Sequence, residues 1–572
     1  MTRNMLRFVL PLLFIIVFSS LADNNMSRLV LSIGEAGREV RFSLPQDDWI
    51  HIKTGQGAER SFRLVDNDGR VSSSTLTDGE GFVELRAGSY TLLGNYGDSI
   101  RIRAVPMTMF FSLAGVDYNA PVEEAVRIVE DKSSKGRPGM YLYNWKWLRK
   151  NILNPFNTIA GASSIPEVFS WCEEGRNCVN TSTAHKTEGL FEHWKSIMDS
   201  QPHKGGIMAD EYIVPVIKHS ADDKGDEQLG YINKGAGFTD YSYDCIRRFA
   251  KEYPGSRFYA WVGVPWDADT ADSKPLLDIL IENDGIIAWE FYANTSYRHE
   301  HPMARHEVRT RGFLKARPDF MRHAMLCPGT YEYISMDPSC DFKVWIDESL
   351  YMFANDPRFN GLRGIGMWAV YYTDPELLRW YSSLLRHYCI EGRTDKFSDL
   401  LGFKLDPDIL KDSDFAQELK PWTVNAAEEG SVFVKKSTEL PFKKSYQPYC
   451  DQVLCMKHVP GKVNSVSQRL SNLVPGNRYV LKTEITEPGV TEKTKYAFGI
   501  ELENCTIEQC LVRDFRDFLP KNNPQFFNTY TVLFRYNGGD CVLTVSDKAS
   551  EGQVQAKDLV IDGISVTPYF EE

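Results

Sequence analysis

The sequence predicts a multidomain chain, in which a central (β/α)8 TIM barrel is flanked by an N-terminal β-sandwich and a C-terminal β jelly roll. Three observations lead to this fold class. The 572 residues are too many for one hydrophobic core. Both ends of the chain alternate apolar and polar residues with a period of two, as strands do. The middle instead alternates short apolar runs with segments of helical periodicity.

The first 22 residues have the pattern of a secretory signal peptide. Two arginines precede an apolar stretch at 8–18 that is too short to span a bilayer comfortably, and residues 20–22 include small side chains suited to a cleavage site. We expect the mature chain to begin near Asp23 and to be secreted, periplasmic or held at the cell surface, with no membrane insertion after cleavage. An uncleaved anchor is the alternative.

Residues 23–105 alternate apolar and polar residues in short runs that turn residues separate, which predicts the β-sandwich domain. Residues 106–395 predict the barrel. Eight candidate strands lie at 107–115, 139–144, 157–163, 205–212, 257–264, 285–292, 324–331 and 364–372. Amphipathic segments lie between these strands, and 374–388 carries one apolar stripe. Eight strand–helix units are the count for a (β/α)8 barrel. A doubly wound sheet is the alternative, but no Gly-rich phosphate loop follows the first strand.

An Asp-rich link at 396–411 leads into 412–572, where strand-rich runs between turns predict the jelly roll. The net charge of −12 and pI of about 5.6 disfavour nucleic acids and anionic membranes as partners. No motif predicts a metal or another cofactor.

The eleven cysteines fit an exported protein. Four close pairs could each form a short disulfide loop: Cys172/Cys178, Cys327/Cys340, Cys450/Cys455 and Cys505/Cys510. Zinc is the alternative, but no pair has CxxC spacing. Cys245, Cys389 and Cys541 have no close neighbour in sequence, and the odd total leaves at least one thiol unpaired.

Carboxylates end several predicted barrel strands, and the active sites of such barrels lie at the strands' C-terminal ends. Glu211 ends GIMADE directly after Asp210, Glu290 ends GIIAWE, and Glu332 follows the seventh strand. Hydrolysis of a glycosidic bond needs two flanking carboxyl groups. We expect Glu211 to be the general acid/base and Glu290 the nucleophile or base. The alternative for each is a structural partner for an arginine or a helix N-terminus.

Aromatic residues near the same strand ends are candidates for sugar binding, because pyranose rings stack on aromatic faces. The predicted substrate-binding residues are Trp261, Trp289, Tyr292, Trp368 and Tyr372. Each of them has core packing as its alternative role.

Two resemblances add to this interpretation. The C-terminal stretches DSDFAQELKPWTV, VSQRLSNLVPGNRYVLKTEI and DLVIDGISVTP resemble carbohydrate-binding modules of families 4 and 9. The middle region resembles (β/α)8-barrel glycoside hydrolases, although Asp210-Glu211 replaces the Asn-Glu of the retaining clan. The Asp-Glu pair is similar to that of glycoside hydrolase families 20 and 123, which implies that the Asp orients an N-acetyl group and the Glu is the general acid.

The sequence therefore predicts a secreted glycoside hydrolase that cleaves an extracellular poly- or oligosaccharide with paired carboxylates. The first alternative is a substrate-assisted N-acetylhexosaminidase that uses Asp210 and Glu211. The second is a non-catalytic glycan-binding or surface scaffold protein.

Overall fold

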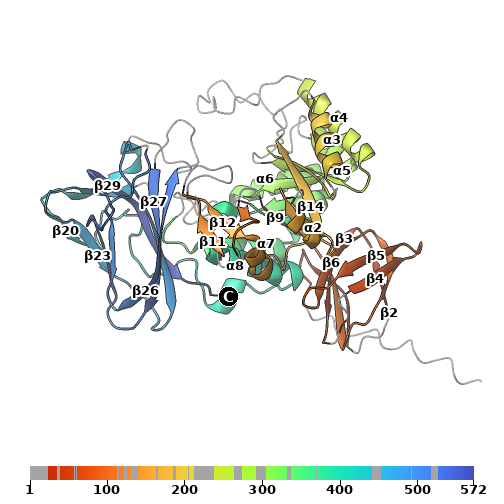
Figure 1. Cartoon of the computed structure of the whole chain (residues 1–572), viewed down its shortest axis with the longest axis horizontal. Helices are drawn as coiled ribbons and strands as arrows, with labels where there is room; N and C mark the ends of the chain where they lie inside the picture. Colours follow the sequence, from red (N-terminus) through yellow and green to blue (C-terminus); the bar gives the residue numbers. More distant parts are fainter. Residues whose placement is uncertain are drawn as a thin grey trace, which may run out of the picture.

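The computed structural model describes residues 23–571 except 35–38, 57, 59–60, 113–114, 122–124, 131–138, 163–164, 184–188, 202, 204, 211–236, 263–273, 292–303, 331–336, 369, 441–451, 491 and 517–525. The molecule is elongated. Figure 1 shows the first strands at one end, a mixed helix–strand body in the middle, and the last strands at the other end. None of the described helices is long and apolar enough to cross a membrane.

In the described part of the chain, eight parallel strands close a barrel in the order β9, β13, β14, β15, β16, β17, β18, β19. Their bounds are Met107–Phe111 (β9), Thr158–Ala160 (β13), Asn177–Thr183 (β14), Gly206–Asp210 (β15), Arg257–Val262 (β16), Ile286–Glu290 (β17), Ala324–Cys327 (β18) and Gly364–Met367 (β19). Gly364 of β19 lies opposite Met107 of β9, so the last strand pairs with the first. The predicted eight-stranded barrel is confirmed.

One predicted barrel strand is wrong. The segment 139–144 forms β12 (Tyr141–Asn144), which lies in a separate three-stranded sheet between β10 (Val116–Asp117) and β11 (Val126–Ile128). The third barrel strand is instead β14, whose sequence NCVNTST contains no apolar run. The segment 157–163, which was predicted as the third barrel strand, forms the second (β13), and β14 forms the third. The predicted fourth and sixth strands therefore keep their places, as β15 and β17.

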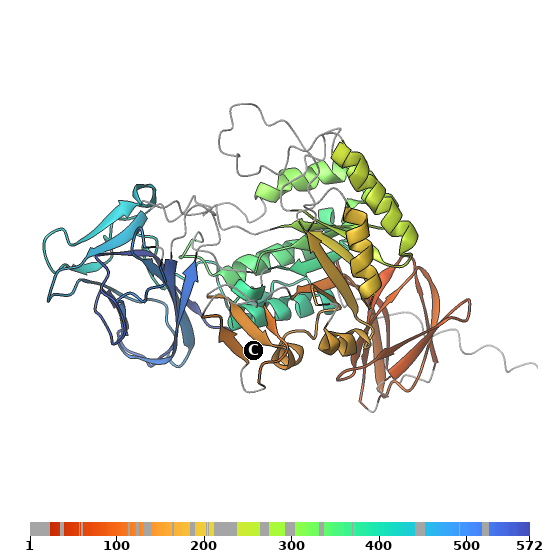
Figure 2. The same cartoon turned by 45° about the horizontal axis from the view of Figure 1, so that its top comes forward.

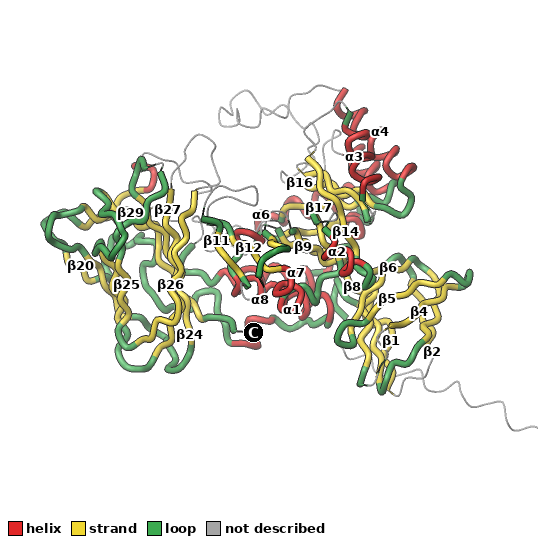
Figure 3. Tube along the Cα trace, viewed as in Figure 1, coloured by secondary structure: helices red, strands yellow, loops and turns green. Residues whose placement is uncertain are grey.

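Helices cover the outside of the barrel (Figures 1 and 2). They are α1 (Trp145–Asn151), α2 (Pro166–Cys172), α3 (Leu190–Ser200), α4 (Gly237–Glu252), α5 (Lys274–Glu282), α6 (Ala304–Ala316), α7 (Phe342–Asn355) and α8 (Pro375–Leu385). Figure 3 shows α3 and α4 side by side on one flank. The predicted apolar stripe of α8 is buried, with Leu378 and Leu384 at 0% exposure. Asp374 caps this helix by accepting a hydrogen bond from Leu377 N at 2.8 Å.

Eight strands precede the barrel and form two antiparallel sheets in the orders β1-β8-β3-β6 and β2-β7-β4-β5. Their bounds are Arg28–Gly34 (β1), Glu39–Leu44 (β2), Asp48–Thr54 (β3), Ser61–Asp66 (β4), Val71–Thr75 (β5), Glu80–Leu85 (β6), Gly88–Leu93 (β7) and Ser99–Val105 (β8). One cluster of buried apolar side chains takes members from both sheets, among them Ile52 of β3 and Leu92 of β7.

After the barrel, a four-stranded sheet has the order β20-β23-β28-β25 and a six-stranded sheet has the order β21-β22-β29-β24-β27-β26. Their bounds are Thr423–Asn425 (β20), Val432–Lys436 (β21), Gln452–Lys457 (β22), Ser465–Arg469 (β23), Arg478–Thr486 (β24), Gly499–Leu502 (β25), Cys505–Arg516 (β26), Phe526–Tyr536 (β27), Val542–Ser546 (β28) and Asp558–Pro568 (β29). Their shared core includes Leu481 and Leu543. The stretch 396–411, expected to be a link, contains α9 (Phe397–Leu401) and the buried Ile409.

The C-terminal sheets are held against the barrel by specific contacts. Lys482 Nζ lies 2.7 Å from Asp374 Oδ2. The chain then returns to the barrel after β29, and we call residues 569–571 the tail. The backbone N–H of Phe570 donates to Glu376 Oε1 at 2.8 Å, and the Phe570 ring lies 5.0 Å from that of Trp380. Phe570 is 4% exposed and belongs to the same apolar cluster as the barrel.

Of the four predicted cysteine pairs, Cys172–Cys178 is disulfide-bonded, as expected. Cys327 and Cys340 are not bridged. Cys505 and Cys510 are not bridged either, because both lie in the extended strand β26. Five residues of strand span roughly 16 Å, which is beyond the reach of a disulfide. The fourth pair includes Cys450, which lies outside the described residues.

Candidate active site

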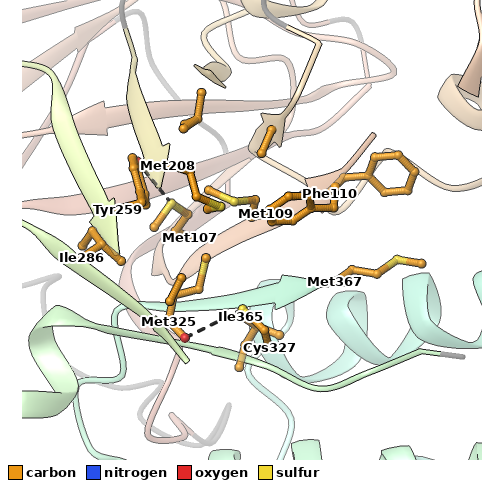
Figure 4. Close-up of a cluster of buried hydrophobic side chains, with 14 of the residues drawn as sticks. Met107, Met109, Phe110, Met208, Tyr259, Ile286, Met325, Cys327, Ile365 and Met367 are labelled. Atoms are coloured by element: carbon orange, nitrogen blue, oxygen red, sulfur yellow. Dashed lines mark hydrogen bonds between the residues drawn. The ribbon is translucent and has the colours of Figure 1, made fainter. Parts of the chain in front are cut away.

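The strand register shows which side chains point into the barrel. The Tyr259 hydroxyl of β16 lies 3.8 Å from Met107 Sδ of β9. These two strands lie on opposite sides of the barrel, so the Tyr259 side chain points into the barrel. Figure 4 shows this contact, with Met208 beside Tyr259. Side chains alternate along a strand, so Trp261, two residues further on, also points inward. Directly paired residues of parallel strands face the same side, and Met208 of β15 is paired with Tyr259.

The same reasoning places two carboxylates on the inner face at the C-terminal end of the barrel. Asp210 is two residues beyond Met208 on β15. Ile286 of β17 is paired with Tyr259, and Glu290 is four residues beyond it. Asp210 and Glu290 are each the last residue of their strand. One strand separates β15 from β17, so their backbones are about 10 Å apart. Two of the predicted catalytic residues therefore lie at one mouth of the barrel.

Glu290 is held by its neighbour on β16. The indole N–H of Trp261 donates to Glu290 Oε1 at 2.6 Å. Such a bond to a carboxylate is stronger than one between neutral groups and fixes the direction of the side chain. On the other side of Glu290, Cys327 is its register partner on β18. Burial, with a smaller contribution from the charge of Glu290, raises the pKa of Cys327 well above its ordinary value, so this neighbour stays an uncharged thiol.

Three aromatic rings meet at the same mouth. Phe111, at the end of β9, lies 4.8 Å from Trp261 and 5.2 Å from Trp368, measured between ring centroids. Trp261 and Trp368 are 5.4 Å apart. Because β16 lies opposite β9 in the ring, the Trp261 side chain crosses the barrel and closes its interior. Trp261 is 0% exposed whereas Trp368 is partly exposed, so Trp368 is the ring of the three that a ligand can reach.

The aromatic group continues beyond β19 into the short helix η4 (Val370–Tyr372). Tyr371 lies 6.3 Å from Trp368, and Tyr372 lies 4.5 Å from Tyr371. Tyr372 is 7% exposed. Of these rings, the sequence predicted Trp261, Trp368 and Tyr372 as ligand contacts. The complete burial of Trp261 corrects its predicted role as a substrate contact. Phe111 was missed, although its place at the end of an apolar strand was a usable signal.

Trp289 lies elsewhere. It precedes Glu290 on β17 and therefore faces the outside of the barrel. Its ring is 1% exposed and lies 5.2 Å from that of Phe313 on α6. Trp289 is packed between strand and helix, which corrects its predicted role as a substrate contact.

Three further predicted site residues, Glu211, Glu332 and Tyr292, lie outside the described residues. Among the residues that are described, no group of three or more His, Cys, Asp or Glu side chains could hold a metal ion.

No family model and no curated protein matches this sequence. Solved structures with a detectable likeness include a β-glucuronidase from Bacteroides uniformis, with 9% identity, a TM-score of 0.34, and coverage of 95% of this chain and 79% of that one. Xylanase A from P. fluorescens subsp. cellulosa in complex with xylopentaose has 12% identity and a TM-score of 0.28, over 46% and 86% of the two chains. The xylan-binding domain CBM22-1 from Paenibacillus barcinonensis has 12% identity and a TM-score of 0.18, over 28% and 93%.

Proposed function

We propose that this protein hydrolyses glycosidic bonds of an extracellular poly- or oligosaccharide at the C-terminal mouth of the barrel. The observation that carries the proposal is the Trp261 N–H bond to Glu290, which aims a carboxylate at a mouth lined with aromatic rings. A carboxylate held in one direction is suited to act on one face of a bound sugar. Trp368 would stack on that sugar, and the buried Trp261 would support the Trp368 ring from below.

In the proposed reaction, Glu211 is the general acid/base and Glu290 the nucleophile or base. Protonation of the leaving oxygen by Glu211 and attack at the anomeric carbon would break the glycosidic bond, and water would complete the hydrolysis. Glu211 follows Asp210 directly in the sequence, and Asp210 ends the strand two places from that of Glu290. This proximity supports the pairing of the two acids.

A second candidate is favoured by the inward orientation of Asp210. Because Asp210 lies on the same inner face as Glu290, it is placed to orient an acetamido group. In that case the substrate's own N-acetyl oxygen would attack, and Glu211 would remain the acid. Glu332, which follows the seventh strand in sequence, is the third candidate for a catalytic carboxylate.

The flanking domains are proposed to serve the same substrate. Two antiparallel sheets that share one core support a β-sandwich at 23–105, and the two C-terminal sheets support a jelly roll at 412–572. We assign to the jelly roll the glycan-binding role of families 4 and 9. The Cys172–Cys178 disulfide supports export through a signal peptide at 1–22.

The proposal is tested by assaying the full chain against a panel of polysaccharides and aryl glycosides, with and without N-acetyl groups. On the glycan that is cleaved, Glu211→Gln and Glu290→Gln should each lower turnover by about 10²- to 10⁴-fold. Glu282→Gln, on an exposed position of α5, is the matched control and should leave turnover unchanged. Melting temperatures of all variants should stay close to that of the wild type.

Asp210→Asn separates the two mechanisms. It should be as damaging as Glu211→Gln on N-acetylated substrates only if the reaction is substrate-assisted. A folded wild-type protein that cleaves nothing on the panel, yet is retarded by a polysaccharide in affinity electrophoresis, would replace both mechanisms with a non-catalytic glycan-binding role.

A further inference from the structure

Two cysteines that are distant in sequence meet at one end of the C-terminal sheets. Cys505 is the first residue of β26 in the six-stranded sheet. Cys541 directly precedes β28 in the four-stranded sheet. Their Sγ atoms lie 3.3 Å apart across 36 residues of sequence. The two thiols thus form one contact between the two sheets, beside the apolar core that the sheets share.

Backbone hydrogen bonds on both sides of this contact keep the two thiols together. Glu503 N donates to Val542 O at 3.0 Å, next to Cys541. Asn537 N donates to Asn504 O at 2.9 Å, next to Cys505. Asn504 itself has a left-handed backbone with φ of +56°, which turns the chain into β26. The close approach of the two cysteine backbones is therefore built into the turn.

The alternative partner for Cys505 is excluded by distance. Cys510 is five residues further along β26 and is exposed. The roughly 16 Å between them along an extended strand exceeds what a disulfide can bridge. Cys541 has 2% exposure, whereas Cys505 is half-buried, so a reagent from solvent reaches Cys505 first.

We propose that Cys505 and Cys541 form a disulfide that staples the two C-terminal sheets together when the protein is exported. The oxidant is a disulfide donor, either glutathione disulfide or the active-site disulfide of a thiol oxidoreductase. The Cys505 thiolate attacks one donor sulfur and releases the first donor thiolate. The Cys541 thiolate then attacks Cys505 Sγ and releases the second. Two protein thiols and one donor disulfide become one protein disulfide and two donor thiols.

The chemistry of the pair predicts how this bond forms. Burial, together with the neighbouring Cys505, raises the pKa of Cys541 to about 12. Burial also raises the pKa of Cys505. Only the thiolate attacks, so little of either thiol is reactive near pH 7. Oxidation by glutathione disulfide alone should therefore be slow at pH 7 and faster at pH 9.

The test uses the purified full chain after oxidation with glutathione disulfide. The protein is denatured without reductant, alkylated, digested and analysed by mass spectrometry. We expect a peptide pair that joins Cys505 to Cys541, and an alkylated Cys510. Cys172–Cys178 serves as an internal reference for complete oxidation. Alkylation of both Cys505 and Cys541 while Cys172–Cys178 is intact would overturn the proposal, as would a Cys505–Cys510 link.

A stability measurement provides a second readout. Removing a disulfide that joins residues 36 positions apart should lower the melting temperature of the C-terminal transition on the order of 5–10 °C. Dithiothreitol should produce this drop in the wild type and in Cys510→Ala. It should have a smaller effect on Cys505→Ala/Cys541→Ala, which starts without the bond. An equal response to dithiothreitol in all three proteins would contradict the staple.

Discussion

The indole N–H of Trp261 donates to Glu290 Oε1 at 2.6 Å, which joins the residue that closes the barrel interior to the carboxylate at its mouth. Trp261 also contacts Phe111, which lies on β9 across the barrel, and Trp368, which directly follows β19. The position of Glu290 is therefore fixed by strands on both sides of the ring. This one side chain couples the packing of the barrel to its proposed chemistry.

Trp261→Phe should lower kcat on the cleaved glycan by about 10- to 100-fold, because a hydrogen bond to a charged group contributes roughly 1.5–3 kcal/mol. The phenyl ring keeps most of the packing, so KM should change little. Trp289→Phe is the matched control, because its ring faces away from the mouth on the adjacent strand. If both variants lose kcat equally, the loss does not come from the Trp261 hydrogen bond to Glu290.

Gly366→Ala should destabilise the barrel. A Cβ at this position would lie 2.6 Å from Cys327 Sγ, and overpacking of this kind costs about 1–3 kcal/mol. Adding Cys327→Ala should restore part of the loss, because it removes the atom that clashes. Gly312→Ala in α6 meets no atom within 4 Å and should not lower the melting temperature. A double variant no more stable than Gly366→Ala would show that the strain lies elsewhere.

Asp374→Asn should remove an acid-sensitive contribution to stability. Burial alone would raise the pKa of Asp374, but Lys482 and the N–H of Leu377 hold it at about 2, below its ordinary value of 3.8. A depressed pKa stabilises the folded state above the unfolded-state value, by about 2 kcal/mol here, and this stabilisation is lost as the pH falls from about 4 to 2.

The melting temperatures of the wild type and Asp374→Asn should therefore differ most near pH 6 and converge toward pH 2. Asp399→Asn, on an exposed position of α9, is the control and should track the wild type at every pH. A difference that stays constant down to pH 2 would mean that the loss comes from the helix cap alone and not from the charge.

Phe570→Ala should lower the free energy of unfolding by about 3–5 kcal/mol, because it leaves a cavity beside Trp380. Calorimetry of the full chain measures this loss. Tyr569→Phe removes only the hydroxyl that accepts from Arg379 at 2.8 Å, so it should cost much less. If the two variants lose equal amounts of unfolding free energy, packing of the Phe570 ring against Trp380 is not the main source of stabilisation by the tail.

The sequence predicted most of the barrel because its strands are short apolar runs that end at polar residues. It failed for β14, whose Asn180 is polar yet buried: its side-chain N–H donates to Gly206 O at 3.3 Å. A strand that satisfies buried polar groups carries no apolar run, so hydrophobicity cannot find it. The apolar β12 was taken for a barrel strand because α1 follows it directly, as in a strand–helix unit.

At the candidate site, the sequence predicted which residues end the barrel strands, but it predicted only some of the directions in which their side chains point. Asp210 and Glu290 were expected at the mouth because each follows a buried run. Trp289 was misplaced, although the period of two that puts Glu290 inside also puts its neighbour outside. Phe111 and Trp261 come into contact across the barrel only because the barrel closes. No local pattern contains that information.

The tail has a consequence for synthesis of the protein. The barrel can close once β19 has left the ribosome, but Phe570 reaches Trp380 only after the C-terminal sheets, which lie between them in sequence, have also been made. A product that stops before residue 569 exposes the Trp380 side of the barrel to water. Chains that lack the tail therefore carry an apolar surface that the tail otherwise covers, and binding of the tail couples completion of the C-terminal sheets to completion of the barrel.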